Sequence, residues 1–178
     1  MKYIAAFLLL VAGVVSPAAF SQAGASAAPA SAAACPTTKT LDELVKALDA
    51  ALSVPGDSDR TCLRDLFLPD ARLWPVVKQP DGSFAPHPLS VEDFIAGSRR
   101  RGNAIVYETQ VKVIPQVYGH IAHLWATYEV RRDSPASKPV ARGINSFYAV
   151  NDGTRWRFQA IEWEAETPAT PLPEKYLP

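Results

Sequence analysis

The chain has 178 residues, of which 48% are hydrophobic and 20% charged, and its 18 basic side chains balance its 18 acidic ones. This balance leaves no basic excess to attract a phosphate backbone, which argues against nucleic acid as a partner. Once an N-terminal export segment and a leader are set aside, about 140 residues remain, which is an ordinary length for one domain.

The first 23 residues have the pattern of a cleavable signal peptide. Lys2 precedes an uncharged apolar run over residues 4–15, and Ser21-Gln22-Ala23 forms a small–x–small cleavage pattern. The run is too short to span about 30 Å of hydrocarbon, so we expect no membrane association after cleavage. We therefore expect cleavage after Ala23 and a periplasmic or secreted protein.

A leader rich in Ala, Ser, Gly and Pro follows over residues 24–36, and it has too little apolar bulk to offset the entropy of ordering. The two cysteines, Cys35 and Cys62, both survive cleavage, and an oxidising compartment favours a disulfide between them. The alternatives are two unpaired thiols, or lipidation of Cys35. Two cysteines without a nearby histidine do not support a zinc site, and we expect no metal.

Three helices are expected in the first part of the domain. The first begins after Thr40, which forms a capping box with Glu43, and its Leu and Val residues recur at helical spacing up to residue 52. A second, shorter helix is expected over residues 59–67. After a short strand over residues 72–78 and a hairpin arm over 83–87, a third helix opens at Ser90 and ends near residue 101.

The sequence of the second part of the domain predicts strands only. Its four segments are rich in β-branched and aromatic residues and cover residues 103–115, 119–132, 139–150 and 155–165. Short connections make neighbouring strands antiparallel. Helices followed by a meander indicate an α+β domain over residues 37–166, with the helices on one face of the sheet. Residues 167–178 are expected to form a Pro-rich, extended tail.

Four patches of sequence carry a resemblance to a known family. They are Leu66-Phe67-Leu68-Pro69-Asp70-Ala71, Arg142-Gly143-Ile144-Asn145-Ser146-Phe147, the segment over residues 152–158, and the ending over residues 171–178. Together they resemble SnoaL-like members of the nuclear transport factor 2-like superfamily. The resemblance implies a cone-shaped fold, with N-terminal helices packed on a strongly bent antiparallel or mixed sheet. It also implies an apolar cavity, and a homodimer through the outer sheet face.

The catalytic patterns known in that superfamily do not fit this sequence. The ketosteroid isomerase pattern implies a Tyr on the first helix, a base after the first strand and a protonated Asp on the penultimate strand. Here the first helix has no Tyr, and the first strand reads Leu73-Trp74-Pro75 without a carboxylate at the position of the base. Asn145 stands where the pattern has the protonated Asp of the penultimate strand. The scytalone dehydratase pattern needs a histidine–carboxylate pair, but His120 and His123 point to opposite faces of a strand.

The remaining catalytic candidates are weak. They are His123, Asn145 and Asp70, as a non-standard pair of His123 with one of the other two. Three glutamates also alternate on one face of the last strand: Glu162, Glu164 and Glu166. Paired carboxylates serve acid–base chemistry, but a solvated or dimer-facing edge explains them better, because like charges would strain a dry pocket.

The aromatic residues are a stronger signal. If Asn145 faces inward, Phe147 does too, and the neighbouring strand is expected to add residues on the same side. The predicted cavity-lining residues are Trp74, Tyr107, Trp125, Asn145, Phe147, Gln159, Ile161 and Trp163. Such a lining favours binding of a small apolar molecule without a cofactor. Plain core packing, a lyase- or isomerase-type enzyme and a structural dimerisation module are the alternatives.

Overall fold

The computed structural model describes residues 34–178. The predicted signal peptide and nearly all of the predicted leader lie outside the described residues. Along the chain the elements are α1 (Leu41–Leu52), α2 (Thr61–Asp65), β1 (Phe67–Lys78), β2 (Phe84–Pro86), β3 (Leu89–Ser90), α3 (Val91–Arg99), β4 (Tyr107–Tyr118), β5 (Ile121–Arg131), β6 (Ala141–Asn151), β7 (Trp156–Ala165) and a 3₁₀ turn, η1 (Glu174–Tyr176).

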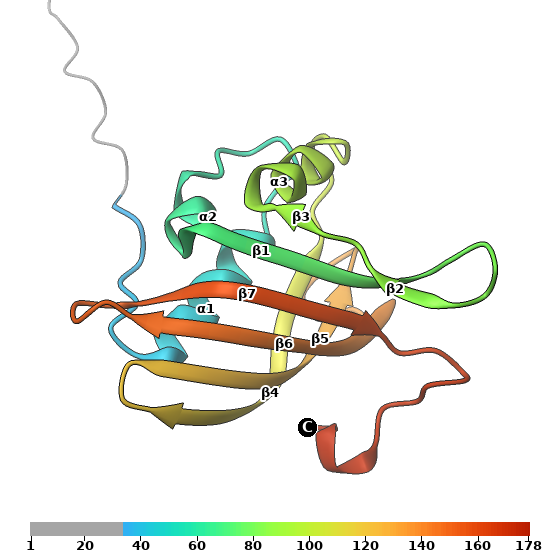
Figure 1. The fold of residues 1–178 in the computed structure, drawn as a ribbon. Helices are drawn as coiled ribbons and strands as arrows, with labels where there is room; N and C mark the ends of the chain where they lie inside the picture. Colours follow the sequence, from blue (N-terminus) through green and yellow to red (C-terminus); the bar gives the residue numbers. More distant parts are fainter. Residues whose placement is uncertain (1–33) are drawn as a thin grey trace, which may run out of the picture. The chain divides into compact units, whose positions relative to one another are not determined.

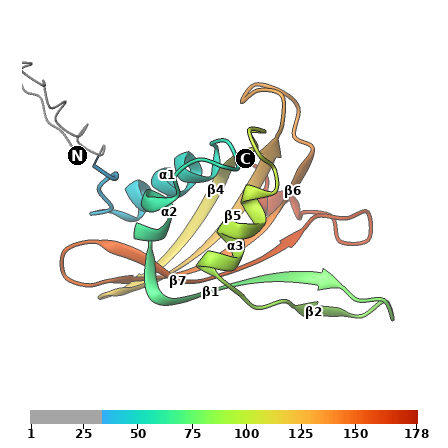
Figure 2. The same ribbon diagram turned by 90° about the horizontal axis from the view of Figure 1, so that it is seen from above.

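The strands form one mixed, curved sheet in the order β2-β1-β7-β6-β5-β4, with β3 paired to β1. β4 to β7 form the expected antiparallel meander, and β1 joins it by pairing in parallel with β7. All three α-helices lie over one face of this sheet, and the other face is turned away from them (Figures 1 and 2). The α+β architecture expected from the order of elements is therefore confirmed.

The helix starts follow the sequence signals closely. The Thr40 hydroxyl accepts the Glu43 backbone N–H at 3.1 Å, and Ser90 forms the same reciprocal box with Asp93 at the start of α3. α2 is shorter than predicted, because the chain already pairs with β7 at its end. The Leu66 carbonyl accepts the Phe158 backbone N–H at 2.8 Å, which draws Phe67 into β1.

Two strands also run beyond their predicted limits. β1 begins at Phe67, and the expected turn at Pro69-Asp70 is a register irregularity inside it. β4 begins later than expected and continues through Pro115, where a turn was predicted. Proline is tolerated there because β4 lies at the edge of the sheet, where one row of N–H groups needs no partner strand.

The core fills the space between the helices and the inner sheet face. Leu44 and Leu63 from the helices, and Leu124, Phe147 and Phe158 from the sheet, are at most 2% exposed. The rings of Phe147 and Phe158 lie 5.0 Å apart, within the range for favourable aromatic pairs. This packing fixes the helices over the strands that form the cavity described below.

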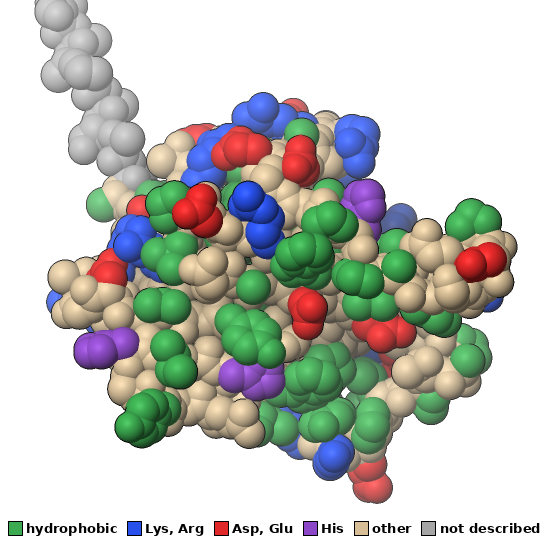
Figure 3. All heavy atoms as spheres, in the orientation of Figure 1, with side chains coloured by type: hydrophobic (Ala, Val, Ile, Leu, Met, Phe, Trp, Pro, Cys, Tyr) green, Lys and Arg blue, Asp and Glu red, His purple; other side chains and the backbone are tan. Residues whose placement is uncertain are grey.

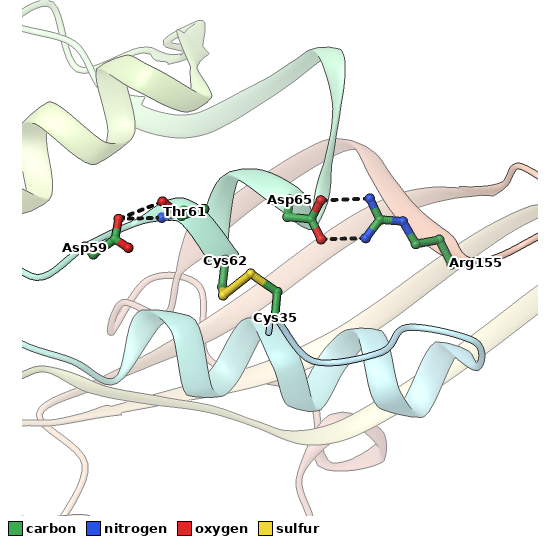
Figure 4. The surroundings of a disulfide bond; sticks show 6 residues. All are labelled: Cys35, Asp59, Thr61, Cys62, Asp65 and Arg155. Carbon is green, nitrogen blue, oxygen red and sulfur yellow. Dashed lines mark hydrogen bonds and ion pairs between the residues drawn. A yellow bond between two sulfur atoms is a disulfide. The ribbon is translucent and has the colours of Figure 1, made fainter. Parts of the chain in front are cut away.

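A disulfide and an ion pair fasten the N-terminal arm and α2 (Figure 4). Cys35 is bonded to Cys62 with their Cα atoms 5.2 Å apart, which confirms the predicted bridge. Asp65 at the end of α2 accepts two hydrogen bonds from the guanidinium of Arg155, at 2.5 and 2.8 Å. No helix within residues 34–178 is long and apolar enough to cross a membrane.

Candidate functional site

A cavity of about 190 Å³ lies between the helices and the inner sheet face. Its walls come from all three α-helices and from five strands. The lining residues are Leu48, Leu52, Leu63, Phe67, Leu73, Phe94, Glu108, Tyr128, Val130, Ala141, Asn145, Phe147, Ile161 and Trp163. Nearly all of these side chains are apolar, so the polar groups among them decide what the cavity can recognise.

Those polar groups come from β4, β5 and β6, which are neighbours in the sheet. Asn145 on β6 is 5% exposed, and its Nδ2 donates to Gln110 Oε1 at 3.0 Å and to Glu108 Oε1 at 3.5 Å. Ser53, the C-cap of α1, exchanges hydrogen bonds with the backbone N–H and carbonyl of Glu108 at 3.1 and 3.2 Å. The helix layer thus holds the backbone of Glu108, and Asn145 in the sheet holds its carboxyl.

A second carboxyl, that of Asp49 on α1, lies close enough to Glu108 for its charge to act on the Glu108 carboxyl. It accepts the Gln110 backbone N–H with both oxygens, at 3.1 and 3.3 Å. Burial raises the pKa of Asp49 to about 6, against the hydrogen bonds from Gln110. Burial also raises the pKa of Glu108 to about 6; the Asn145 amide works against this rise, and the Asp49 charge adds to it.

Tyr128 adds a hydroxyl to the same end of the cavity. Burial raises the pKa of Tyr128 to about 12, and the nearby charge of Glu108 adds to the shift, so the phenol keeps its proton. Its hydroxyl oxygen lies where a side chain at Gly143 would begin, because a Cβ there would come within 2.8 Å of it. Gly143 therefore leaves the space that the Tyr128 hydroxyl occupies.

One donor at this end is unsatisfied. Gln110 Nε2 is buried and has no hydrogen-bond partner within residues 34–178. Buried polar atoms are nearly always paired, and the Gln110 amide lowers the pKa values of both Asp49 and Glu108, against the effect of burial. The polar end thus combines a carboxyl that can lose or hold a proton near neutral pH, a protonated phenol and an amide network that positions them.

The structure places half of the predicted cavity residues in this lining: Asn145, Phe147, Ile161 and Trp163. The other four, Trp74, Tyr107, Trp125 and Gln159, are not in it. Alternation along the strands explains the first three. Leu73 and Glu108 line the cavity, and Ala126 pairs with Asn145, so these residues face inward. Their direct neighbours in sequence, Trp74, Tyr107 and Trp125, therefore face outward.

Gln159 is turned outward for a different reason. The β6–β7 pairing shifts register between Tyr148 and Ala149, so the extra residue on β7 falls at Gln159. Phe158 faces inward before the shift and Ile161 faces inward after it. The prediction for Gln159 assumed strict alternation back from Ile161 and Trp163. It is wrong because the extra residue at the bulge reverses which side chains face inward.

The three weak catalytic candidates are not brought together. Asn145 faces the cavity, whereas His123 lies on the outer face with its Nε2 3.0 Å from Ser146 Oγ. Asp70 is exposed at the irregular start of β1. The suggested pairing of His123 with Asn145 or Asp70 does not form: Asn145 lies on the other face of the sheet, and β7 and β6 lie between Asp70 on β1 and His123 on β5. Within residues 34–178, no group of three or more His, Cys, Asp or Glu side chains is placed to hold a metal ion.

Sequence reasoning missed Asp49, Glu108 and Tyr128. A signal existed for Asp49, which interrupts the apolar stripe of α1 between Val45 and Leu52 at helical spacing. A carboxylate on the face of a helix that packs on a sheet needs a partner or a function. Glu108 and Tyr128 gave no comparable signal, because only the strand pairing brings them beside Asn145.

No known protein family matches the sequence, and no curated protein is similar to it. Solved structures are similar in fold. A nuclear transport factor 2-like protein from Cytophaga hutchinsonii is 13% identical, with 71% of this chain and 92% of that chain covered and a TM-score of 0.50. A provisionally described ketosteroid isomerase from Parabacteroides distasonis is 14% identical, with 76% and 98% covered and a TM-score of 0.50.

A third similar structure, a protein of unknown function with a cystatin-like fold from Nostoc punctiforme, is 15% identical, with 75% of this chain and 92% of that chain covered and a TM-score of 0.53. The chain thus has the nuclear transport factor 2-like fold that the sequence resemblance implied. Identities this low carry no activity from those proteins to this one.

Proposed function

We propose that the domain binds a small, mostly apolar molecule in the cavity beneath the helices, with the molecule's one polar group against Glu108 and Tyr128. The observation that carries this proposal is the placement of a carboxyl and a phenol at one end of an otherwise apolar cavity of about 190 Å³. A cavity of about 150 Å³ accepts benzene, so a substituted single ring fits and a four-ring steroid does not.

Titration with 4-ethylphenol and ethylbenzene tests this proposal. We expect 4-ethylphenol to bind with a dissociation constant of about 0.1–1 mM, as its size allows. Ethylbenzene should bind about 5- to 100-fold more weakly, because it leaves the carboxyl and the phenol without a partner. Equal affinity for the two probes, or no binding of either, would contradict the proposal.

Two matched variants place the binding in the cavity. Val130→Phe adds a ring to the lining and should abolish 4-ethylphenol binding. Val140→Phe makes the same change at a site that is 57% exposed and outside the lining, and it should leave the affinity unchanged. Circular dichroism of both variants checks that they are folded.

A second function, proton transfer within the bound molecule, is favoured by one observation. The raised pKa of Glu108, about 6, lets its carboxylate accept a proton from a bound carbon acid and return it at neutral pH. The Tyr128 hydroxyl would donate a hydrogen bond to the carbonyl oxygen of the bound molecule and so stabilise the negative charge that develops on that oxygen. Such an enzyme would be an isomerase or a lyase.

Deuterium exchange into a small ketone measures this activity directly. We expect the protein to exchange the α-protons of cyclohexanone in D₂O with a pH profile that rises through about 6. Glu108→Gln should remove the exchange. Exchange that persists in Glu108→Gln, or that equals the rate without protein, would rule out proton transfer by Glu108. The proposal that the cavity binds a small molecule would not be affected by that result.

We also propose that the protein is exported. The disulfide between Cys35 and Cys62 supports this, because such bonds persist in oxidising compartments. Mass spectrometry of the protein purified from its host should find a mature chain that starts at Gly24 with both thiols oxidised. An intact N-terminus with free thiols would contradict export.

A further inference from the structure

The C-terminal segment crosses the outer face of the sheet and is held there by several contacts. The Leu172 backbone N–H donates to Glu166 Oε1 at 2.9 Å, and the Thr127 hydroxyl donates to the Tyr176 carbonyl at 2.5 Å. Lys112 Nζ donates to the Leu177 carbonyl at 2.7 Å. Figure 1 shows this segment leaving the end of β7 and turning back toward the strands.

Between this segment and the strands lies a groove of about 380 Å³, which we call the outer groove. Its floor includes Trp125 and Ser146, and its roof includes Leu172 and Tyr176. The rings of Trp125 and Tyr176 lie 5.8 Å apart, so the segment brings an aromatic side chain from η1 against one from β5. The floor of the groove is the opposite face of the sheet from the inner cavity, and Trp163 is the one residue that lines both.

The charge of the outer groove is negative. Glu162 and Glu164 line it, and neither belongs to an ion pair within residues 34–178. A third lining carboxylate, that of Glu166, is already paired with Arg142. The lining contains no lysine or arginine. Figure 3 shows apolar side chains gathered on this face of the sheet, with acidic ones among them.

One further feature shows that a ring of this groove accepts a cation. The ammonium of Lys175 lies 4.8 Å from the centre of the Tyr176 ring, so this ring already takes part in a cation–π contact. The Lys175 side chain is exposed, so a ligand cation can take its place on the ring. A ligand that carries a positive charge would complement the carboxylates and the rings.

We propose that the outer groove binds a small organic cation of the quaternary ammonium type. Its positive charge lies near Glu162 and Glu164 and against the aromatic rings of Trp125 and Tyr176. Aromatic rings and carboxylates together recognise such cations, because the methyl groups around the nitrogen prevent close hydration and leave dispersion and cation–π attraction. This site does not depend on ligand binding in the inner cavity.

Choline and its neutral isostere 3,3-dimethylbutan-1-ol form a matched pair of probes. Titrations of the full mature chain at low salt, followed by tryptophan fluorescence, should show that choline binds at least about fivefold more tightly than the alcohol. The preference should decline as salt is added. Equal affinity for the two probes would overturn the proposal, because shape alone would then explain the binding.

Variants locate the site. Glu162→Gln combined with Glu164→Gln keeps the shape of both side chains, and it should weaken choline binding at least about fivefold. Glu174→Gln removes an exposed charge from the same C-terminal segment, outside the lining, and should change nothing. Val130→Phe, which fills the inner cavity, should leave choline binding unchanged. Retained affinity in the double variant would overturn the proposal.

Two other occupants are outcomes of the same experiment. A phospholipid headgroup also carries choline, but its phosphate would meet Glu162 and Glu164. Phosphocholine should therefore bind more weakly than choline, and tighter binding of phosphocholine would overturn the assignment to a free cation. If sedimentation shows a dimer that binds no choline and separates on mutation of Trp125, the groove is a contact between copies instead.

Discussion

Glu108 carries a carboxyl into an apolar cavity, so its protonation is coupled to the stability of the fold. Burial raises its pKa from 4.5 to about 6, which means that the folded protein holds this proton more tightly than the unfolded chain does. Stability therefore falls as the pH rises from about 4.5 to about 6, and the loss is complete above that window. Asp49, whose pKa is also raised to about 6, acts in the same direction.

Glu108→Gln should remove this loss. The amide keeps the size of the carboxyl and can still accept the Asn145 hydrogen bond, but it has no charge to bury. We expect the variant to be more stable than the wild type by about 2 kcal/mol at pH 8, and equally stable at pH 4. Urea unfolding at both values measures this. A difference that does not vary with pH would contradict the assignment.

Arg60 carries a further buried charge, since its side chain is 1% exposed, and its hydrogen-bond acceptors are neutral. Its guanidinium donates to the carbonyls of Ala51, Pro55 and Gly56 at 2.7, 2.9 and 3.3 Å, which closes the connection between α1 and α2. Arg60→Ala should lower the free energy of unfolding by about 2–4 kcal/mol, because three buried or partly buried carbonyls lose their donor.

Two comparisons make the measurement on Arg60 specific. Arg60→Lys should recover only part of the loss, since one ammonium cannot match the planar fork. Arg132→Ala, which removes an exposed guanidinium, should change stability by less than about 0.5 kcal/mol. If Arg60→Ala is as mild as Arg132→Ala, the guanidinium is not what holds this connection.

At the scale of elements, the disulfide attaches the N-terminal arm to α2. Cys35 and Cys62 are 27 residues apart in sequence, and closing a loop of this length stabilises a fold by about 3–4 kcal/mol in the chain-entropy model. The double variant Cys35→Ser, Cys62→Ser should lose that amount in urea unfolding. The wild type in reducing agent should match the variant, and a loss below about 1 kcal/mol would show that the bridge is not structural.

The elements also show where sequence reasoning works. Capping boxes at Thr40 and Ser90 are local signals, and both helices begin where these predict. The phase of β7 is not a local property, because the bulge at Gln159 appears only when β7 pairs with β6. The parallel pairing of β1 with β7 could not be predicted from local sequence either, since it joins residues more than 80 positions apart.

The candidate site was predictable to a similar extent. Asn145 and Phe147 were predicted correctly because both lie on one strand, where alternation alone shows that they face the same side. The acid at the cavity end was missed, because Asp49 and Glu108 meet only after α1 has packed on β4. Residues that act together across elements are joined by tertiary packing, and alternation within a single strand cannot show this.

At the scale of the whole molecule, an apolar patch lies on the outer sheet face near the turn between β4 and β5. Tyr118, Ile121 and Tyr148 are 84%, 59% and 49% exposed, and the strand register places all three on the outer face. Exposed apolar patches mark interaction sites, and we expect two copies of the chain to associate here. A stable dimer would bury about 800 Å² on each copy.

Sedimentation equilibrium measures this association. The wild type should form a dimer, and Ile121→Glu combined with Tyr148→Glu should be monomeric. Phe84→Glu changes a side chain that is 55% exposed on β2, at the other edge of the sheet, and should leave the dimer intact. A monomeric wild type at about 100 μM would contradict a dimer through this patch.

The inner cavity remains the centre of the function proposed for this molecule. Intermolecular nuclear Overhauser effects from bound 4-ethylphenol report directly on its position. We predict contacts from its ring protons to the side chains of Phe147 and Phe94, which line the inner cavity but not the outer groove, and none to Trp125 or Tyr176. Contacts to Trp125 and Tyr176 alone would place the molecule in the outer groove and contradict binding beneath the helices.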